Sequence, residues 1–283
     1  MDIKLVASDL DGTIIDKNNN ISPKNFEAIK LIKEKNIPFT ICTGKSYSVA
    51  KKSCEKFTAD YGIFGNGTQV VDLNKDLELQ RNILKKDDLL YIATIAKRFN
   101  LHLHIYTESQ VISETLQFLD LRNFILKTKY DFCDLEFKLV PDISEYIYNE
   151  SPDVFSAVIS SEESIDFFEL YLNVNKNIAY NFNSKKGIYK DTIINKEYEY
   201  LNITPLHTNK DEALDFLTKM LNIDKKNVMA IGDNINDYEM VKNAGIGVAV
   251  NEAYDELKEV ADYVTEATTS EGAFSEAVEK FIK

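Results

Sequence analysis

The sequence lacks long apolar runs. None of its 283 residues belongs to an apolar stretch that approaches the ~18 residues needed for a membrane-spanning helix. Asp2 and Asp9 lie where a signal peptide would carry apolar side chains. We therefore expect a cytoplasmic protein that has no membrane partner.

Cysteine and positive charge are also scarce. The three cysteines, Cys42, Cys54 and Cys133, lack the paired spacing of a zinc site, so we expect reduced and mostly buried thiols. Lys and Arg total 33 against 46 Asp and Glu, and the formal net charge of −13 repels polyanions. We therefore expect no nucleic-acid partner.

Both ends of the chain alternate strand-like and helix-like segments. Residues 1–72 have a βαβαβ pattern, and its first strand is a nearly continuous apolar run, typical of a parallel strand buried on both faces. Ser22 and Pro23 mark the start of the first helix. The expected buried stripe of this helix is Phe26, Ile29 and Ile32. The same alternation returns near the C-terminus, so 1–83 and 205–283 predict one α/β core, Rossmann-like, with a parallel sheet.

Residues 84–204 have a different composition. Aromatic residues crowd together, charges alternate with apolar residues, and Gly187 is the one glycine in the segment. An α+β domain inserted into the core explains this change. The stretches near 73–84 and 203–208 are expected to connect the two parts.

The stretch SDLDGT places Asp9 and Asp11 directly after the first predicted strand. A calcium-binding EF-hand is excluded, because its loop needs a glycine at position six and follows a helix, whereas Gly12 is fourth when counted from Asp9. A solvated Asp-Gly turn remains an alternative. The carboxyl ends of parallel strands are, however, where open sheets bind ligands. Two carboxylates this close repel each other unless a cation or a proton lies between them, and Mg²⁺ suits such hard oxygen ligands.

A second acidic cluster, GDNINDYEM, follows another predicted strand near the C-terminus. It contains Asp233, Asn234, Asn236 and Asp237. Two strand-terminal clusters in one sheet can converge on a single metal ion. Together they favour a metal site over two unrelated turns.

Two further features suit an anion. Thr43 and Gly44 end a predicted strand before a helix, where a hydroxyl and backbone N–H groups can cradle a phosphate. Lys210 begins another predicted helix and can supply the positive charge that a transferring phosphoryl group needs. Each feature alone is also compatible with an ordinary turn or a solvated lysine.

Taken in order, SDLDGT, TGK, Lys210 and GDNINDYEM, with Asn66-Gly67 after the third strand, resemble the haloacid dehalogenase (HAD) superfamily of phosphatases, and specifically its Cof-like subfamily of type IIB. The resemblance extends over essentially the whole chain. It implies a Rossmann-like core with an inserted α+β cap of the C2B type at 84–204. It also implies Mg²⁺ as cofactor, a small phosphorylated metabolite as partner, and a monomer or weak homo-oligomer.

The resemblance implies a role for each matching residue. Asp9 would be the nucleophile that forms an aspartyl-phosphate, and Asp11 would be the general acid and base. The catalytic set implied is Asp9, Asp11, Thr43 and Lys210. The phosphate contacts implied are Leu10, Thr43, Gly44, Lys210 and Asn236. The Mg²⁺ ligands implied are Asp9, Asp11 through its backbone carbonyl, Asp233 and, in a supporting position, Asp237.

The implied activity is Mg²⁺-dependent hydrolysis of sugar phosphates, or of cofactor phosphates such as FMN or pyridoxal phosphate. Two alternatives remain, a phosphosugar mutase and a noncatalytic phosphate-binding or signalling protein. The chain also departs from its relatives, which often have arginine at the position of Lys45 and glycine at the position of Asp211. Lys45 offers a point charge in place of the planar fork of arginine, so it bears on contacts with the leaving group.

Overall fold

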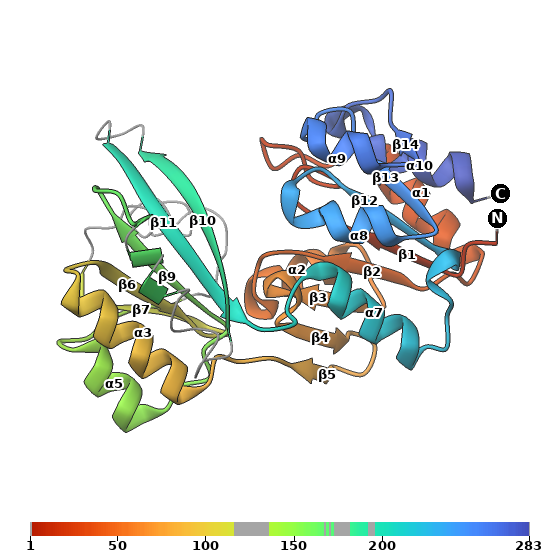
Figure 1. Cartoon of the computed structure of the whole chain (residues 1–283). Helices are drawn as coiled ribbons and strands as arrows, with labels where there is room; N and C mark the ends of the chain where they lie inside the picture. The colour runs from red at the N-terminus through yellow and green to blue at the C-terminus, as the bar shows by residue number, and fades with distance from the viewer. Residues whose placement is uncertain are drawn as a thin grey trace. The chain divides into compact units, whose positions relative to one another are not determined.

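The computed structural model describes residues 2–115, 136–166, 168–169, 171–172, 182–191 and 196–282 (Figure 1). The chain divides into two compact units, a first unit of Met1–Arg81 with Thr208–Lys283 and a second unit of Asn82–His207. Cys42 and Cys54 are free and buried, as predicted, and Cys133 lies outside the described residues. Within the described ranges, no helix is both long enough and apolar enough to cross a membrane.

The first unit contains an eight-stranded sheet with the order β14-β13-β12-β1-β2-β3-β4-β5. Its strands are β1 (Leu5–Ser8), β2 (Phe39–Cys42), β3 (Tyr61–Phe64), β4 (Gln69–Asp72), β5 (Leu77–Arg81), β12 (Val228–Gly232), β13 (Ile246–Ala249) and β14 (Tyr263–Val264). The strands from β14 to β3 are parallel, which confirms the predicted α/β class.

The last two strands of this sheet differ from the prediction. β4 and β5 pair antiparallel, so the sheet is mixed, and β5 lies inside the stretch 73–84 that the sequence predicts to be a connection. β5 is an edge strand with no fully buried residue. Its apolar alternation consists of Leu77 and Leu79 alone, which is a weak signal for a strand.

Helices cover both faces of the sheet. They are α1 (Pro23–Glu34), α2 (Tyr47–Lys56), α7 (Lys210–Met220), α8 (Tyr238–Asn243), α9 (Asp255–Val260) and α10 (Ala273–Phe281). Single turns of 3-10 helix occur at η1 (Gly65–Gly67), η2 (Lys225–Asn227), η3 (Ile235–Asp237) and η4 (Thr269–Glu271). α1 and α10 pack into the core on one face, and α7 packs into the core on the other.

The central strand β1 is buried on both sides, as predicted. Val6 belongs to the core that contains Ile29 and Ile32 of α1, whereas Leu5 and Ala7 belong to the core under α7. Alternate side chains of a strand point to opposite faces, so a continuous apolar run fits this position. Because β1, β2 and β12 are parallel neighbours, their carboxyl ends meet at one edge of the sheet.

The prediction for the apolar stripe of α1 was wrong at one position. Ile29 and Ile32 are buried, but Phe26 is 39% exposed. The buried face of the helix is Asn25, Ala28, Ile29 and Ile32. Phe26 therefore lies at the rim of that face, where its ring stacks on Phe57 with the centroids 5.8 Å apart.

The second unit is an α+β structure with a six-stranded sheet in the order β10-β11-β9-β6-β7-β8. Its strands are β6 (His102–Tyr106), β7 (Gln110–Ser113), β8 (Glu136–Leu139), β9 (Ser156–Ser161), β10 (Phe182–Asp191) and β11 (Lys196–Pro205). Its named helices are α3 (Lys86–Arg98) and α5 (Ile143–Glu150). Both helices share one apolar core with the sheet, in which Ile92 and Ile147 join Ile105 and Ile159.

Candidate active site

Asp9 directly follows β1 at the carboxyl edge of the first unit's sheet. Its backbone N–H donates to the Ile231 carbonyl of β12 over 2.9 Å, which continues the parallel pairing beyond the end of β1. The Asp9 carbonyl accepts a hydrogen bond from Ser8 Oγ over 2.8 Å. The residue is only 6% exposed. The apolar strand and its neighbour therefore hold one carboxylate in a fixed, nearly dry position.

The turn after Asp9 packs against the second acidic cluster. Gly12 has a φ of 90°, and a Cβ on it would lie 2.3 Å from Asp233 Oδ2. Thr13 Oγ1 donates to Asp233 Oδ1 over 3.4 Å, and Thr269 Oγ1 donates to the Gly12 carbonyl over 2.5 Å. Glycine is needed here for both its backbone conformation and its small size. Gly12 is therefore packed against the second acidic cluster, which a freely solvated Asp-Gly turn would not be.

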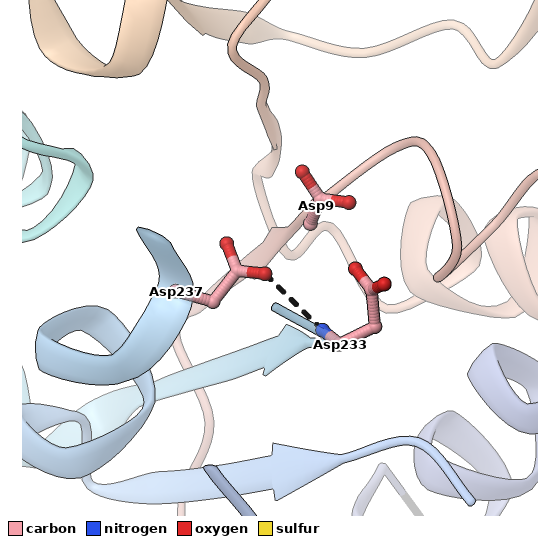
Figure 2. A group of neighbouring side chains, drawn as sticks. All are labelled: Asp9, Asp233 and Asp237. Atoms are coloured by element: carbon pink, nitrogen blue, oxygen red, sulfur yellow. Dashed lines mark hydrogen bonds between the residues drawn. The ribbon is translucent and has the colours of Figure 1, made fainter. Parts of the chain in front are cut away.

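Three carboxylates converge at this edge. Carboxylate oxygens of Asp9, Asp233 and Asp237 all lie within 4.8 Å of one another. Figure 2 shows the three side chains turned toward a shared space, with Asp9 at the end of β1 and the other two after β12. The structure thus brings together the two acidic clusters that the sequence places more than two hundred residues apart.

Lys210 is the cation of this group. It is the first residue of α7 and is fully buried. Its Nζ donates to Asp9 Oδ1 over 2.5 Å and to Asp237 Oδ1 over 2.6 Å. Burial by itself would lower the pKa of Lys210, but attraction by Asp237 and then Asp9 outweighs it and raises the pKa above its ordinary value. Lys210 is therefore a permanent positive charge against the Asp9 carboxylate.

Asp237 is fully engaged by protein donors. Its Oδ1 accepts from Lys210, and its Oδ2 accepts from the backbone N–H groups of Asp233 and Asn234, both over 3.1 Å. The second of these bonds is half of a capping box at the start of η3. Gly232 allows this close approach, since a Cβ there would lie 2.5 Å from Asp237 Cβ. Asp237 is therefore built to hold Lys210 and the loop of Asp233 in place.

The remaining negative charge is not balanced by Lys210. Burial, aided by repulsion from Asp237 and Asp233 and opposed by Lys210, raises the pKa of Asp9 well above its usual range. Burial, followed by repulsion from Asp237, raises the pKa of Asp233 to about 6. A divalent cation between the carboxylates would remove this cost, and hard oxygen donors suit Mg²⁺. The residues present therefore fit a magnesium ion.

Asp11 lies apart from the carboxylate trio. Its side chain is 45% exposed, and its Oδ1 accepts from Lys45 Nζ over 2.7 Å. Asp11 is absent from the group of converging carboxylates. The geometry thus separates a buried acid, Asp9, from a solvent-accessible acid, Asp11, that is tethered to a lysine.

The predicted phosphate contacts lie around the same strand ends. Thr43 follows β2, is 1% exposed, and its N–H donates to the Ile63 carbonyl over 2.8 Å. Thr43 Oγ1 accepts from the Lys45 N–H over 3.2 Å, which leaves its own O–H able to donate. The Leu10 side chain is fully buried in the apolar core, so a contact between Leu10 and a phosphoryl group would fall to its backbone.

Asn236 is the middle residue of η3, with its amide against another loop. Its Nδ2 donates to Asn66 Oδ1 over 2.9 Å. Sequence reasoning did not foresee this contact, nor the Lys45–Asp11 pair, nor the bridge that Lys210 makes between Asp9 and Asp237. The asparagine-glycine dipeptide after β3 was the one available signal for the first of them, since it marks a turn of unusual conformation.

Comparisons with known proteins identify the family of this chain. Residues 6–277 match the family of haloacid dehalogenase-like hydrolases. A 5-amino-6-(5-phospho-D-ribitylamino)uracil phosphatase of Bacillus subtilis is 27% identical over 273 residues, which cover 96% of this chain and 93% of the relative. A phosphoglycolate phosphatase of Methanothermobacter thermautotrophicus is 27% identical over 282 residues, which cover 99% of both chains.

Solved structures show the same fold. A phosphatase of the haloalkanoate enzyme superfamily from Bacteroides thetaiotaomicron superposes with a TM-score of 0.81 at 20% identity, covering 99% of this chain and 95% of that one. A protein from Thermotoga maritima superposes with a TM-score of 0.79 at 22% identity, covering 99% and 98% of the two chains. The family match extends from β1 to α10 and includes every strand end described above. This chain belongs to the haloacid dehalogenase-like hydrolase family.

Proposed function

We propose that the protein is a Mg²⁺-dependent phosphatase that hydrolyses small phosphorylated metabolites through an aspartyl-phosphate on Asp9. The observation that carries the proposal is the contact of buried Lys210 with both Asp9 and Asp237, beside Asp233. This arrangement holds the Asp9 carboxylate against a positive charge at a strand end. Such a carboxylate is suited to attack phosphorus while its neighbours stabilise the transferring charge.

In the first half of the reaction, a carboxylate oxygen of Asp9 attacks the phosphorus atom. The bond between phosphorus and the ester oxygen breaks, and Asp11 gives a proton to the departing alcohol. The exposure of Asp11 fits this role, because the group must reach a leaving group outside the buried trio. Lys210 and the Thr43 hydroxyl would hold the phosphoryl oxygens during the transfer.

In the second half, Asp11 takes a proton from a water molecule, and that water attacks the phosphorus of the aspartyl-phosphate. The acyl-phosphate bond breaks between phosphorus and the Asp9 oxygen, which releases inorganic phosphate and restores the Asp9 carboxylate. The same side chain therefore acts as acid and then as base. Attack by a sugar hydroxyl in place of water would instead make the protein a mutase.

The Mg²⁺ ion would be held by the carboxylates of Asp9 and Asp233 and by the backbone carbonyl of Asp11, with Asp237 in support. When bound, it supplies positive charge that offsets repulsion between the phosphate and the carboxylates. Asp233 is positioned for this by the Thr13 hydroxyl and by the absence of a side chain at Gly12.

The substrate class rests on the relatives and on the second unit. Relatives of similar length are named as phosphatases of 5-amino-6-(5-phospho-D-ribitylamino)uracil, of phosphoglycolate and of HMP-PP. We propose that the second unit is the C2B-type cap and sets the choice among substrates such as sugar phosphates, FMN and pyridoxal phosphate. Its size and α+β architecture support this assignment.

Release of inorganic phosphate from a panel of these metabolites tests the proposal. We expect turnover that depends on Mg²⁺, that stops on chelation and that is lost in Asp9→Asn. Asp16→Asn is a matched control, because Asp16 is an aspartate in the same unit whose bonds stay within its own exposed turn. Full activity of Asp9→Asn would overturn the assignment of Asp9 as the nucleophile. Formation of an isomerised sugar phosphate without release of inorganic phosphate would favour the mutase alternative.

A further inference from the structure

The turn after β3 has an unusual backbone conformation. Asn66, the middle residue of η1, has φ 55° and ψ 34°, in the left-handed region, and it lies between two glycines that also have positive φ. Asparagine tolerates this region better than other residues that carry a side chain. Backbone in sparsely populated conformations is concentrated at functional sites. Asn66 carries the one side chain of this three-residue turn.

The backbone of this turn contacts two of the segments that carry the proposed catalytic groups. The Asn66 N–H donates to the Thr43 carbonyl over 3.1 Å, and the Gly65 N–H donates to the Lys45 carbonyl over 2.8 Å. A Cβ on Gly67 would lie 2.3 Å from the carbonyl oxygen of Asn209, the residue before Lys210. The turn thus packs directly against the loop of Thr43 and the start of α7.

The side chain of Asn66 reaches the third segment. Its Oδ1 accepts from Asn236 Nδ2 over 2.9 Å. The same Oδ1 lies close to Gly44, the glycine predicted to help cradle the phosphate, since a Cβ on Gly44 would be 3.2 Å from this oxygen. Asn66 is therefore in contact with both Gly44 and Asn236, and so it links the strand end of β2 to the acidic loop after β12.

We propose that Asn66 is a positioning residue that orients the Asn236 amide toward the phosphoryl group, an inference that rests on the proposed phosphatase function. One Nδ2 hydrogen of Asn236 is held by Asn66, so the direction of the second hydrogen is fixed. Asn236 is on the exposed side of the site, where an amide without this bond would rotate freely. The bond therefore reduces the ordering that the substrate would otherwise have to impose.

Two substitutions of Asn66 distinguish the positioning role of its side chain from a purely structural role. Asn66→Gly removes the amide at a backbone angle that glycine adopts without strain, and the N–H bond to the Thr43 carbonyl remains. Asn66→Ala removes the same amide but adds the strain of a left-handed alanine. The two variants should therefore differ in stability. If the amide positions Asn236, they should show the same loss of activity.

Asn222 is a matched control. It has φ 54°, close to that of Asn66, and it lies just beyond the far end of α7 from Lys210. Asn222→Gly and Asn222→Ala should reproduce the stability difference and keep wild-type activity. For Asn66→Gly we expect kcat/KM for p-nitrophenyl phosphate with Mg²⁺ to fall roughly 3- to 10-fold, the usual worth of one hydrogen bond. The inhibition constant of inorganic phosphate should rise by a similar factor.

A double-mutant cycle identifies the partner. If Asn66 acts through Asn236, then Asn66→Gly should have no further effect on kcat/KM in an Asn236→Ala background. Independent effects of the two substitutions on kcat/KM would overturn the proposal, and so would wild-type activity of Asn66→Gly. The proposal would also fail if the loss of activity simply followed the loss of stability among the variants of Asn66 and Asn222. Failure of the phosphatase proposal looks different, because the wild-type protein itself would then release no phosphate.

Discussion

Lys45 Nζ lies 2.7 Å from Asp11 Oδ1, and both side chains remain exposed, at 39% and 45%. Ion pairs in such positions contribute little to stability, because water screens them and ordering two side chains costs entropy. The pair nevertheless determines where the proposed acid and base points. It also places a positive charge beside the position where the leaving oxygen would develop negative charge.

Lys45→Met should therefore affect activity more than stability. We expect the free energy of unfolding to change by less than ~1 kcal/mol, the usual limit for an exposed pair. Loss of the tether should lower kcat by roughly 10- to 100-fold, a part of what general acid catalysis contributes. Lys51→Met is the control, because Lys51 of α2 forms a similarly exposed pair with Asp76. Equal activity of the two variants would show that Lys45 does not contribute to catalysis.

Gly12→Ala should disrupt the site by its shape alone. A left-handed alanine costs about 1–2 kcal/mol, and its Cβ would also displace the Asp233 carboxylate. We expect lower thermal stability and a loss of phosphate release. Gly272→Ala provides the comparison, since Gly272 has φ 105° but its Cβ would approach Lys24 and Ser22 at 3.3 Å. A Gly12→Ala variant that is destabilised but fully active would contradict the placement of Asp233.

Asp233→Asn should weaken the magnesium site without removing the nucleophile. Replacing a charged ligand with an amide should raise the Mg²⁺ concentration at half-maximal activity by at least roughly tenfold, since even supporting residues of metal sites have effects of this size. A titration of activity against Mg²⁺ measures this, with Asp255→Asn as an exposed control in α9. An unchanged midpoint would show that Asp233 does not hold the ion.

Buried His104 should make the second unit sensitive to acid. Burial, aided by repulsion from His102, lowers the pKa of His104 to about 4. The unfolded histidine has a pKa of about 6.5, so its contribution is fully present above that pH and is lost as the pH falls toward 4. The free energy of unfolding should fall by as much as about 3 kcal/mol, because His104 binds a proton in the unfolded chain but not in the folded one.

Urea unfolding of wild type and His104→Gln at about pH 7 and about pH 4.5 measures this contribution. The variant should be less destabilised by acid than the wild type. His102→Gln, two residues along the same strand and only partly buried, should retain most of the acid sensitivity, because burial, the larger cause of the shift in the His104 pKa, remains. Identical pH dependence in wild type and His104→Gln would contradict the assignment.

The positions of Asp9, Thr43 and Asp233 could be predicted from the sequence because each follows a buried parallel strand. Apolar periodicity locates such strands, and parallel strands end at a common edge. The bridge made by Lys210 could not be predicted in this way, because a lysine at a helix start looks the same whether it is solvated or buried. Its partners depend on how α7 packs against the sheet, which no local pattern encodes.

The unpredicted features share a physical origin. β5 is a short edge strand without a buried face, and its alternation of two leucines with polar residues is a weak signal. Phe26 has helical spacing with Ile29, but the buried face of α1 runs through Asn25 and leaves Phe26 at its rim. The Asn66–Asn236 bond joins two loops across the sheet. Each of these depends on tertiary packing, whereas the strand-end acids depend on strand burial alone.

Accumulation of a phosphoryl group on Asp9 tests the central claim most directly. The leaving group of p-nitrophenyl phosphate departs without needing a proton, so Asp11→Asn should still form the aspartyl-phosphate but hydrolyse it slowly. We predict a burst of p-nitrophenol approaching one equivalent per enzyme. Mass spectrometry of the quenched protein should find one added phosphoryl group on Asp9. A linear time course with an unmodified Asp9 peptide would contradict the account.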